Sequence, residues 1–317
     1  MESGRLFIAN QLGSETAARI NARFPAVLVS SERMEPAWNV PANADILVAG
    51  PATIWSNAPS AGPAAWPRHL QWIQLSAAGV DGYPRWIFEG PAVTSARGVN
   101  SVPIAEFVLA SMLAFEKRFP EAWHARREAS RRLQLGMLQG KTAGLVGLGS
   151  IGQTVARLAQ AFGMEVLAYR RNLHNPAPPG VTIVHELGAL LAASDHIVVA
   201  AAMTPQTRRL LDAQALSVVK PGAHLVNVAR GPIIDHEALV QALRSGRIAG
   251  ASLDVTEPEP LPDDHPLRAL PSVRISPHVA FISPGTRERL TEKFLDNLDR
   301  FLHQQPLCDV VNPAQGY

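Results

Sequence analysis

Residues 144–152 read GLVGLGSIG, and the structure expected for the rest of the chain follows from this stretch. From position 147 onwards its glycines have the spacing G-x-G-x-x-G. Apolar residues precede them, and the following segment, IGQTVARLAQAFG (151–163), places its apolar residues on one helical face. This context predicts a strand, a tight turn and a helix N-terminus, which together bind the pyrophosphate of a dinucleotide. The cofactor-binding residues expected in this turn are Gly147, Gly149, Ser150, Ile151 and Gly152.

The next strand, expected over residues 164–170, should end at the adenosine ribose of the bound dinucleotide. An acidic residue usually stands about 20 positions after the glycines and binds the ribose hydroxyls. Here the chain has Arg170 and Arg171 instead. A guanidinium pairs bidentately with phosphate, so the two arginines predict NADP(H), which carries a 2′-phosphate. The alternative is that both arginines are solvated and that the site accepts NAD.

Strand-like and helix-like segments alternate along the chain, which predicts parallel sheets with helices on both faces. The strand-like segments before the glycine turn are RLFIA (5–9), AVLVS (26–30), DILVAG (45–50), LQWIQLS (70–76) and AVTSA (92–96). Those from the turn onwards are AGLVGL (143–148), MEVLAYR (164–170), HIVVAAA (196–202), HLVNVA (224–229), GASLDV (250–255) and VRISPH (273–278). About six strands in the second series would complete a doubly wound domain.

Two long helical patterns suggest where the domains meet. One spans residues 98–119, just before the second series of strands, and the other lies in the tail at residues 284–312. We expect the tail helix to return to the first domain. The substrate (catalytic) domain would then comprise residues 1–98 plus 285–317, and the NAD(P)-binding domain residues 99–284.

Composition excludes several classes of protein. Of 317 residues, 47% are hydrophobic and 18% charged, and the formal net charge is +2, which favours a packed globular chain without nucleic acid or membrane as partner. The longest apolar run, residues 197–203, is far shorter than a membrane span, and the N-terminus does not resemble a signal peptide. Cys308 is the one cysteine, so no internal disulfide is possible and a cytoplasmic location is expected.

A basic segment, EAWHARREASRRL (121–133), contains Arg126, Arg127, Arg131 and Arg132. We interpret it as a solvated face of a helix or linker, the alternative being a surface for an anionic partner.

Three downstream segments carry residues suited to catalysis: NVARGPIIDHEAL (227–239), GASLDVTEPEPLPDDHPL (250–267) and SPHVAFISP (276–284). Together with the glycine turn they resemble the D-isomer-specific 2-hydroxyacid dehydrogenase family. That family includes D-lactate, D-glycerate and phosphoglycerate dehydrogenases and glyoxylate/hydroxypyruvate reductases. The resemblance is dense from residue 99 to residue 278 and thinner before that. It implies an α/β fold of two doubly wound parallel-sheet domains, a Rossmann-type cofactor domain inserted into a flavodoxin-like substrate domain.

The resemblance also implies a catalytic set of Arg230, Glu259 and His278. His278 would donate the proton during reduction and accept it during oxidation. Glu259 would hydrogen-bond the other imidazole nitrogen of His278 and favour its charged form. Arg230 would hold the substrate carboxylate and polarise the carbonyl group. Glu257 is a nearby alternative, but the spacing from Asp254 selects Glu259.

Other positions match the family's binding residues. Ala78 and Gly79 match a loop whose backbone N–H groups bind the substrate carboxylate, and Asn100 matches an Asn at the interdomain hinge near that site. Asp254 matches the residue that holds the nicotinamide carboxamide. The remaining cofactor contacts implied by the resemblance are Thr204, Pro205 and Ala229.

These residues lead to a functional expectation. The protein would transfer a hydride between NADP(H), with NAD as the alternative, and a small D-2-hydroxyacid or its 2-oxoacid, as glyoxylate/hydroxypyruvate reductases do. A dinucleotide-sensing, corepressor-like interaction protein on the same fold is the other hypothesis. A homodimer is expected, and no metal. The aromatic residues Phe281, Trp55, Trp72 and Trp86 are expected in the core, the alternative being that they line a pocket. The other histidines, His196, His224, His236 and His265 among them, show no metal-ligand spacing and are interpreted as ordinary.

Overall fold

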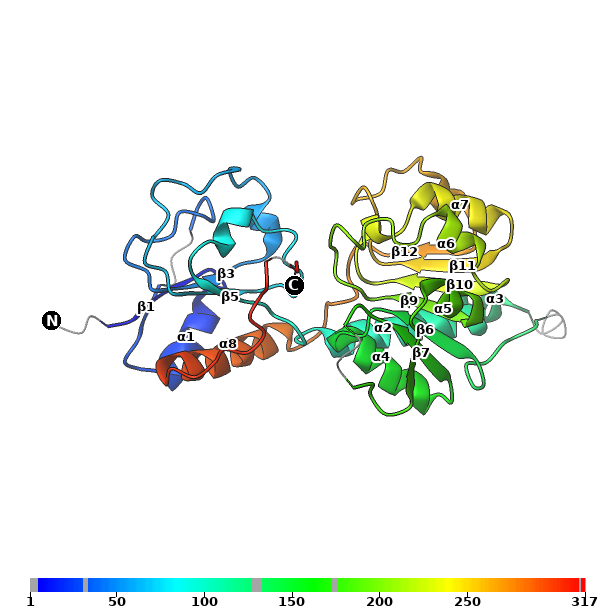
Figure 1. The fold of residues 1–317 in the computed structure, drawn as a ribbon, viewed down its shortest axis with the longest axis horizontal. Helices are drawn as coiled ribbons and strands as arrows, with labels where there is room; N and C mark the ends of the chain where they lie inside the picture. The colour runs from blue at the N-terminus through cyan, green and yellow to red at the C-terminus, as the bar shows by residue number, and fades with distance from the viewer. Residues whose placement is uncertain (1–4, 31–33, 127–132, 173–175, 314, 317) are drawn as a thin grey trace. The chain divides into compact units, whose positions relative to one another are not determined.

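The computed structural model describes residues 5–30, 34–126, 133–172, 176–313 and 315–316. The chain forms two compact units: Met1–Val99 with Pro284–Tyr317, and Asn100–Ser283. The first unit is therefore built from two separate stretches of sequence. Each unit contains one parallel β-sheet with helices packed on it (Figure 1).

The first unit has a five-stranded sheet in the order β2-β1-β3-β4-β5, and every neighbouring pair is parallel. Its strands are β1 (Phe7–Asn10), β2 (Leu28–Val29), β3 (Ile46–Ala49), β4 (Trp72–Leu75) and β5 (Ala92–Thr94). This is the strand order of flavodoxin-like sheets. The parallel α/β sheet expected for this part of the chain is confirmed, but α-helices cover only one of its faces and not both.

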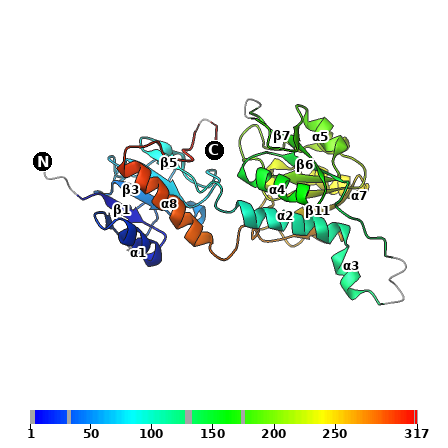
Figure 2. The same cartoon turned by 90° about the horizontal axis from the view of Figure 1, so that it is seen from below.

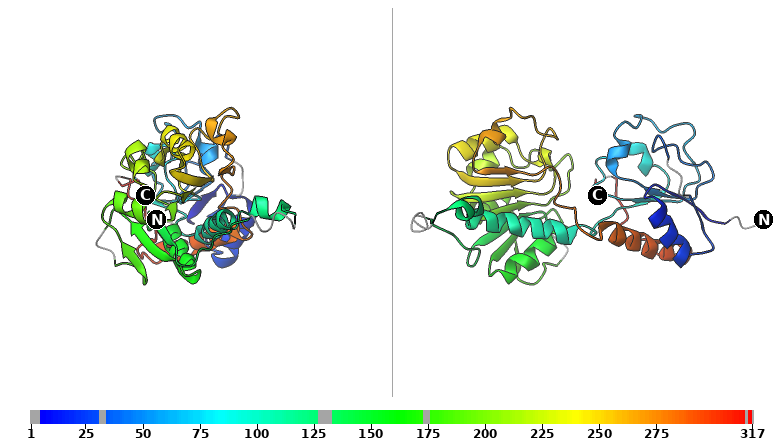
Figure 3. Two further views of the ribbon diagram at one scale, coloured as in Figure 1. Left: turned by 90° about the vertical axis from the view of Figure 1, so that its right-hand side faces the viewer. Right: turned by 180° about the vertical axis from the view of Figure 1, so that it is seen from behind.

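One face of this sheet is covered by α1 (Ser14–Arg23) and α8 (Thr286–Leu302), which lie side by side (Figures 1 and 3). The ring of Trp72 on β4 stacks on Phe294 of α8, with 5.1 Å between the ring centroids. The helix near the C-terminus thus packs on the sheet formed by the N-terminal residues. The other face is covered by loops that contain the 3-10 turns η1 (Ala52–Trp55) and η2 (Arg85–Phe88).

The second unit has a seven-stranded parallel sheet in the order β12-β11-β10-β9-β6-β7-β8. Its strands are β6 (Thr142–Val146), β7 (Glu165–Tyr169), β8 (Val181–Ile183), β9 (His196–Val199), β10 (Ala223–Asn227), β11 (Ile248–Leu253) and β12 (Val273–Ile275). Counted from β6, this is the Rossmann order with an additional strand, and the direction of winding changes between β6 and β9. The expectation of about six strands missed β8, a three-residue edge strand.

Helices cover both faces of this sheet. Val146 and Val199 pack toward α5 (Leu187–Ala193), α6 (Ala213–Ser217) and α7 (His236–Arg244). The alternating positions Leu145 and Val198 pack toward α2 (Ser101–Glu116) and α4 (Ser150–Ala161). The sheet is thus buried on both faces, which is why its strands read as apolar runs in the sequence.

The prediction of a single helix over residues 98–119 is wrong in one respect. The chain leaves the helical conformation after α2, where Arg118 has φ 46°, and a second short helix, α3 (Phe119–His124), follows. In Figure 2, α3 extends away from the end of α2 rather than along the sheet.

The basic segment next to α3 is only partly described. Arg126 is exposed, whereas Arg127, Arg131 and Arg132 lie outside the described residues. Across the described ranges, none of the helices combines the length and the apolar character needed to cross a bilayer.

Candidate active site

The glycine turn joins β6 to α4, and close backbone contacts leave no room for a Cβ at two of its glycines. Gly147 has φ 104°, and a Cβ there would stand 2.7 Å from the backbone of Ala201. A Cβ on Gly152 would stand 2.3 Å from the carbonyl oxygen of Gly147, so only glycine lets the helix approach the turn this closely. Gly149 is the N-cap of α4, and open space lies where its side chain would be. The turn therefore offers free backbone N–H groups and the positive end of a twelve-residue helix to a pyrophosphate.

The two arginines follow β7, the strand next to the turn. The N–H of Gly147 donates to the carbonyl oxygen of Tyr169, 2.9 Å away, so Arg170 begins beside the glycine turn. Arg170 is half-buried and donates from Nη1 to the Pro176 carbonyl oxygen at 3.3 Å, and Arg171 is exposed. Two cations thus stand where the adenosine ribose end of a dinucleotide is expected.

The other residues expected to bind the cofactor follow the carboxyl ends of neighbouring strands. Thr204 and Pro205 lie in the loop after β9, and Thr204 is fixed by a hydrogen bond from its N–H to Thr207 Oγ1 at 2.8 Å. Ala229 follows β10, and Asp254 follows β11. Because parallel strands bring their carboxyl ends to one edge of the sheet, these residues lie along the same edge as the glycine turn, where doubly wound sheets bind ligands.

His278 and Glu259 form a close pair on this edge. The Nδ1 atom of His278 lies 2.7 Å from Oε1 of Glu259, and the two side chains are 39% and 42% exposed. A carboxylate can only accept, so Nδ1 carries the proton and Nε2 is left to exchange a proton with a substrate. Glu257 instead forms an ion pair with Arg208 at 2.7 Å. The histidine thus contacts Glu259, the residue expected from the spacing.

Arg230 lies next to the loop that carries Glu259. It follows β10 as the N-cap of the short turn η4 (Gly231–Ile233), and its Nη1 donates to the Ala229 carbonyl oxygen at 2.8 Å. Gly231 packs directly on the backbone of Thr256, because a Cβ there would stand 2.1 Å from the Thr256 carbonyl oxygen. Arg230, Glu259 and His278 are thus carried by adjoining backbone segments of one unit.

The expected substrate residues outside this set lie elsewhere in the chain. Ala78 and Gly79 follow β4 in the first unit, where Ala78 is exposed. In the same loop region burial raises the pKa of Tyr83 to about 12, and its hydroxyl donates to the Gly50 carbonyl oxygen at 2.9 Å. Asn100 is the N-cap of α2, at the start of the second unit.

The expectation that the named aromatic residues belong to the core is correct for three of them and wrong for the fourth. Trp55, Trp72 and Trp86 are buried. Phe281 is 37% exposed, and its ring meets the imidazole of His278 edge to face with 5.8 Å between the centroids. An exposed ring beside His278 can contact the side chain of a bound substrate.

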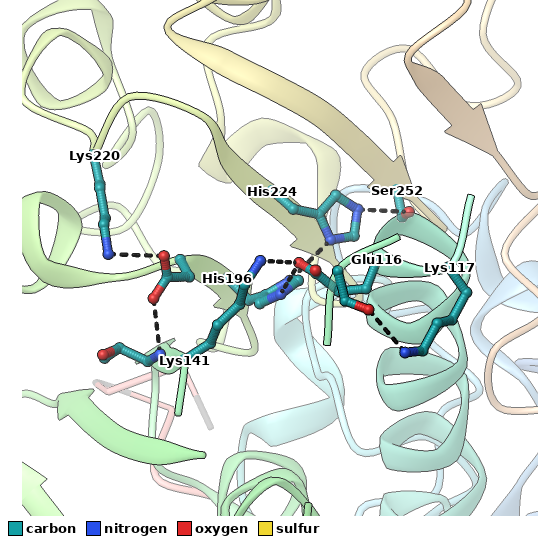
Figure 4. A network of polar contacts seen from close by, with 10 residues as sticks. Glu116, Lys117, Lys141, His196, Lys220, His224 and Ser252 are labelled. Atoms are coloured by element: carbon teal, nitrogen blue, oxygen red, sulfur yellow. Dashed lines mark hydrogen bonds and ion pairs between the residues drawn. The ribbon is translucent and has the colours of Figure 1, made fainter. Parts of the chain in front are cut away.

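Sequence reasoning missed a buried polar network in the same unit (Figure 4). Oε1 of Glu116 accepts from Nζ of Lys141 at 2.5 Å and from Nε2 of His196 at 3.0 Å. The chain continues from Nδ1 of His196 to Nδ1 of His224, 3.3 Å apart, and from Nε2 of His224 to Oγ of Ser252 at 3.0 Å. Both histidines are buried, and they are register partners on β9 and β10.

This network lies at the amino edge of the sheet, opposite the glycine turn, because His196 is the first residue of its strand and His224 the second. The lack of metal-ligand spacing gave no indication of this network, and the pairing of the two histidines was not predicted. A signal was available, since both apolar strand patterns open with histidine. Among the described residues, no three His, Cys, Asp or Glu side chains come together as metal ligands.

Comparison with known proteins agrees with this geometry. The model of the "D-isomer specific 2-hydroxyacid dehydrogenase, NAD binding domain" matches residues 109–280. A glyoxylate reductase from Aeropyrum pernix is 38% identical over 240 residues, which cover 70% of this chain and 70% of that protein.

Two solved structures extend the likeness to both units. A D-isomer specific 2-hydroxyacid dehydrogenase from Xanthobacter autotrophicus, in complex with NADPH and MES, has a TM-score of 0.83 and 29% identity, covering 98% of this chain and 99% of that one. An NADPH-dependent glyoxylate/hydroxypyruvate reductase from Sinorhizobium meliloti, in complex with NADP and malonate, has a TM-score of 0.74 and 27% identity, covering 97% of each chain. The protein therefore belongs to the D-isomer specific 2-hydroxyacid dehydrogenase family, as an NAD(P)-dependent oxidoreductase.

Proposed function

We propose that the protein reduces a small 2-oxoacid to the D-2-hydroxyacid with NADPH, in the manner of glyoxylate/hydroxypyruvate reductases. The observation that carries this proposal is the 2.7 Å pair of His278 and Glu259 on the sheet edge that also bears the glycine turn. The identity to glyoxylate reductases supports the substrate class.

The residues of the second unit fit the chemistry of this reaction. When bound, the reduced nicotinamide supplies the hydride. His278 gives the proton to the carbonyl oxygen from Nε2, and Glu259 keeps the imidazole oriented by accepting a hydrogen bond from Nδ1. Arg230 binds the carboxylate and polarises the carbonyl group, because a guanidinium presents several donors to oxygen. We assign Ala78 and Gly79 to the substrate carboxylate as well, and Asn100 to the hinge near it.

The cofactor preference is proposed from Arg170 and Arg171. A 2′-phosphate would gain charge-assisted hydrogen bonds from them, whereas the acid that usually binds the ribose hydroxyls would repel it. Two of the solved relatives described above hold NADPH or NADP, which supports the same choice.

A panel of 2-oxoacids tests the proposal. Glyoxylate, hydroxypyruvate and longer 2-oxoacids are each supplied with NADPH and with NADH, and nucleotide oxidation is followed. We expect turnover with NADPH, a lower KM for NADPH than for NADH, and a loss of about 10² to 10⁴ in kcat for His278→Ala. His303→Ala, which alters an exposed histidine at the C-cap of α8, serves as the control. Tight NADPH binding without turnover of any substrate would favour the corepressor-like sensor instead.

We also propose that the protein forms a homodimer through the α2–α3 region. Trp123 on α3 is 74% exposed and stacks on Phe119 with 4.6 Å between the ring centroids. Both rings line a pocket of about 550 Å³, together with residues of α2 and β11. Light scattering after gel filtration should give twice the chain mass for the wild type and a monomer for Trp123→Glu. A monomeric wild type would overturn this assignment.

A further inference from the structure

We propose that Asp254 is a positioning residue for His278, which it holds through the backbone on either side of the imidazole. The family resemblance gives Asp254 a different task, that of binding the nicotinamide carboxamide. The inference deepens the proposed function, on which its kinetic readout rests, and it is argued from contacts within the second unit alone.

The carboxylate of Asp254 accepts hydrogen bonds from the segment that contains His278. Oδ1 accepts from the Ser276 hydroxyl at 2.6 Å and from the Val279 N–H at 2.9 Å. Oδ2 accepts from the Ala280 N–H at 3.0 Å. The main-chain oxygen of Asp254 accepts from the N–H of His278 itself at 2.9 Å. Four hydrogen-bond donors within residues 276–280, the segment that contains His278, therefore bind Asp254.

The backbone of His278 needs such support. Its φ of 55° lies in the left-handed region, which costs a residue with a Cβ about 1–2 kcal/mol. A conformation of this kind persists only where the surroundings fix it. The donors of Ser276 on one side, and of Val279 and Ala280 on the other, attach both flanks of His278 to the same carboxylate. This conformation is the one in which Nδ1 of His278 reaches Glu259.

A carboxylate is required for this arrangement. Asp254 is 2% exposed, so little water can replace a lost contact. An ionised carboxylate only accepts hydrogen bonds, whereas an asparagine amide has one oxygen and one NH₂ donor. In Asp254→Asn, at least one of the three donors would therefore face another donor. A buried donor left unsatisfied costs about 1–3 kcal/mol, which the segment can relieve by moving.

The test uses Asp254→Asn and Ser276→Ala, alone and combined, in the full-length protein. Asp263→Asn is the matched control, because Asp263 lies between β11 and β12 but is fully exposed. Three quantities are measured for each variant: kcat with the best 2-oxoacid, the dissociation constant for NADPH, and the ¹⁵N shifts of the His278 imidazole. The last two do not depend on turnover, and the His278 signals are identified by their loss in His278→Asn.

We expect D254N to lower kcat by about 100-fold, because displacement of a catalytic group by about 1 Å has an effect of this size. S276A should lower kcat by about tenfold, because it removes one hydrogen bond to a charged acceptor. The double variant should be no slower than D254N, since both changes act on one contact. The NADPH dissociation constant should change by no more than about threefold. The ring nitrogens of His278 should lose their distinct protonated and unprotonated shifts and become averaged.

Two results would overturn the inference. In the first, D254N weakens NADPH binding as much as it lowers kcat while the His278 shifts stay those of the wild type, which would assign Asp254 to the cofactor. In the second, D254N does not fold, and S276A retains both the wild-type kcat and the wild-type His278 shifts. A wild type that turns over no 2-oxoacid would refute the proposed function, and the His278 shifts of the variants would still test the positioning.

Discussion

Replacing Glu116 by glutamine should destabilise the second unit strongly, although this residue lies far from the glycine turn. Glu116 is 5% exposed and accepts from Lys141 and His196. Burial alone raises the pKa of Glu116, but the hydrogen bonds and charges of His196 and Lys141 outweigh burial and hold the pKa below its usual 4.5. Removal of the negative charge leaves the Lys141 cation, whose side chain is 34% exposed, without its anion.

The size of the expected destabilisation follows from the partial exposure of the Lys141 side chain. Breaking a fully buried ion pair by removing one partner costs about 3–5 kcal/mol. Because solvent reaches Lys141, we expect the lower end, about 3 kcal/mol, out of a total stability of about 5–15 kcal/mol. A group whose pKa is lowered by folding contributes stability above its unfolded pKa and loses that contribution as the pH falls through the folded pKa. The difference between wild type and Glu116→Gln should therefore be constant from about pH 6 to 8 and shrink below about pH 4.5.

The assay must report on the correct unit. Of the six tryptophans, only Trp123 lies between residues 100 and 283, so tryptophan fluorescence would follow mainly the first unit. Calorimetry with and without saturating NADPH is better suited, since the transition that the cofactor raises belongs to the unit that binds it. Glu121→Gln, an exposed position on α3, is the control. A Glu116→Gln variant within about 0.5 kcal/mol of the wild type would refute the reasoning.

Three further predictions test other parts of the chain. Burial lowers the pKa of His224 well below 6.5, so below about pH 6 the unfolded chain binds a proton there that the folded chain does not. The stability of the second unit should therefore fall by roughly 1.4 kcal/mol per pH unit below about pH 6. The variant His224→Gln, measured by the same calorimetry, should show a flatter dependence of stability on pH. Gly231→Ala would place a Cβ 2.1 Å from the Thr256 carbonyl oxygen and should lower kcat by about tenfold or more, whereas Gly188→Ala, whose Cβ would meet its nearest neighbour at 3.8 Å, should leave kcat unchanged. Arg171→Ala should raise KM for NADPH by about 10- to 100-fold and leave KM for NADH nearly unchanged, and an equal rise for both nucleotides would contradict the 2′-phosphate assignment.

Much of the fold follows from local patterns in the sequence. The strands that begin at His196 and Ala223 read as apolar runs because both faces of their sheet are covered by helices. The glycine turn is recognisable for a related reason, since close backbone contacts leave no room for a Cβ at Gly147 and Gly152. Patterns of this kind do not show where a helix stops for reasons outside it. The end of α2 at Glu116 is an example, because the break depends on Arg118 adopting a left-handed conformation, and the nearest proline follows four residues later at position 120.

Contacts between distant residues are harder to predict. Glu116 meets His196 across 80 positions, and Ser276 meets Asp254 across 22. Each contact depends on which strands are neighbours and in which register they pair. The pairing of β9 with β10 sets His196 beside His224, and only then does the packing of α2 bring Glu116 to them. The sequence shows each of these residues, but which residues contact one another depends on the strand order and register of the whole sheet.

The two edges of the second sheet therefore place different demands on their polar residues. At the carboxyl edge, His278 and Glu259 are about 40% exposed, so protons and substrate can reach them, and substitutions there should change rates more than stability. At the amino edge, Glu116, His196 and His224 are buried and paired, so substitutions there should change stability more than rates. Asp254 combines both properties, since it is buried like the amino-edge residues but accepts hydrogen bonds from the segment that carries the exposed His278. Its replacement should therefore lower both kcat and stability, a combination not expected for a residue that contacts only the cofactor.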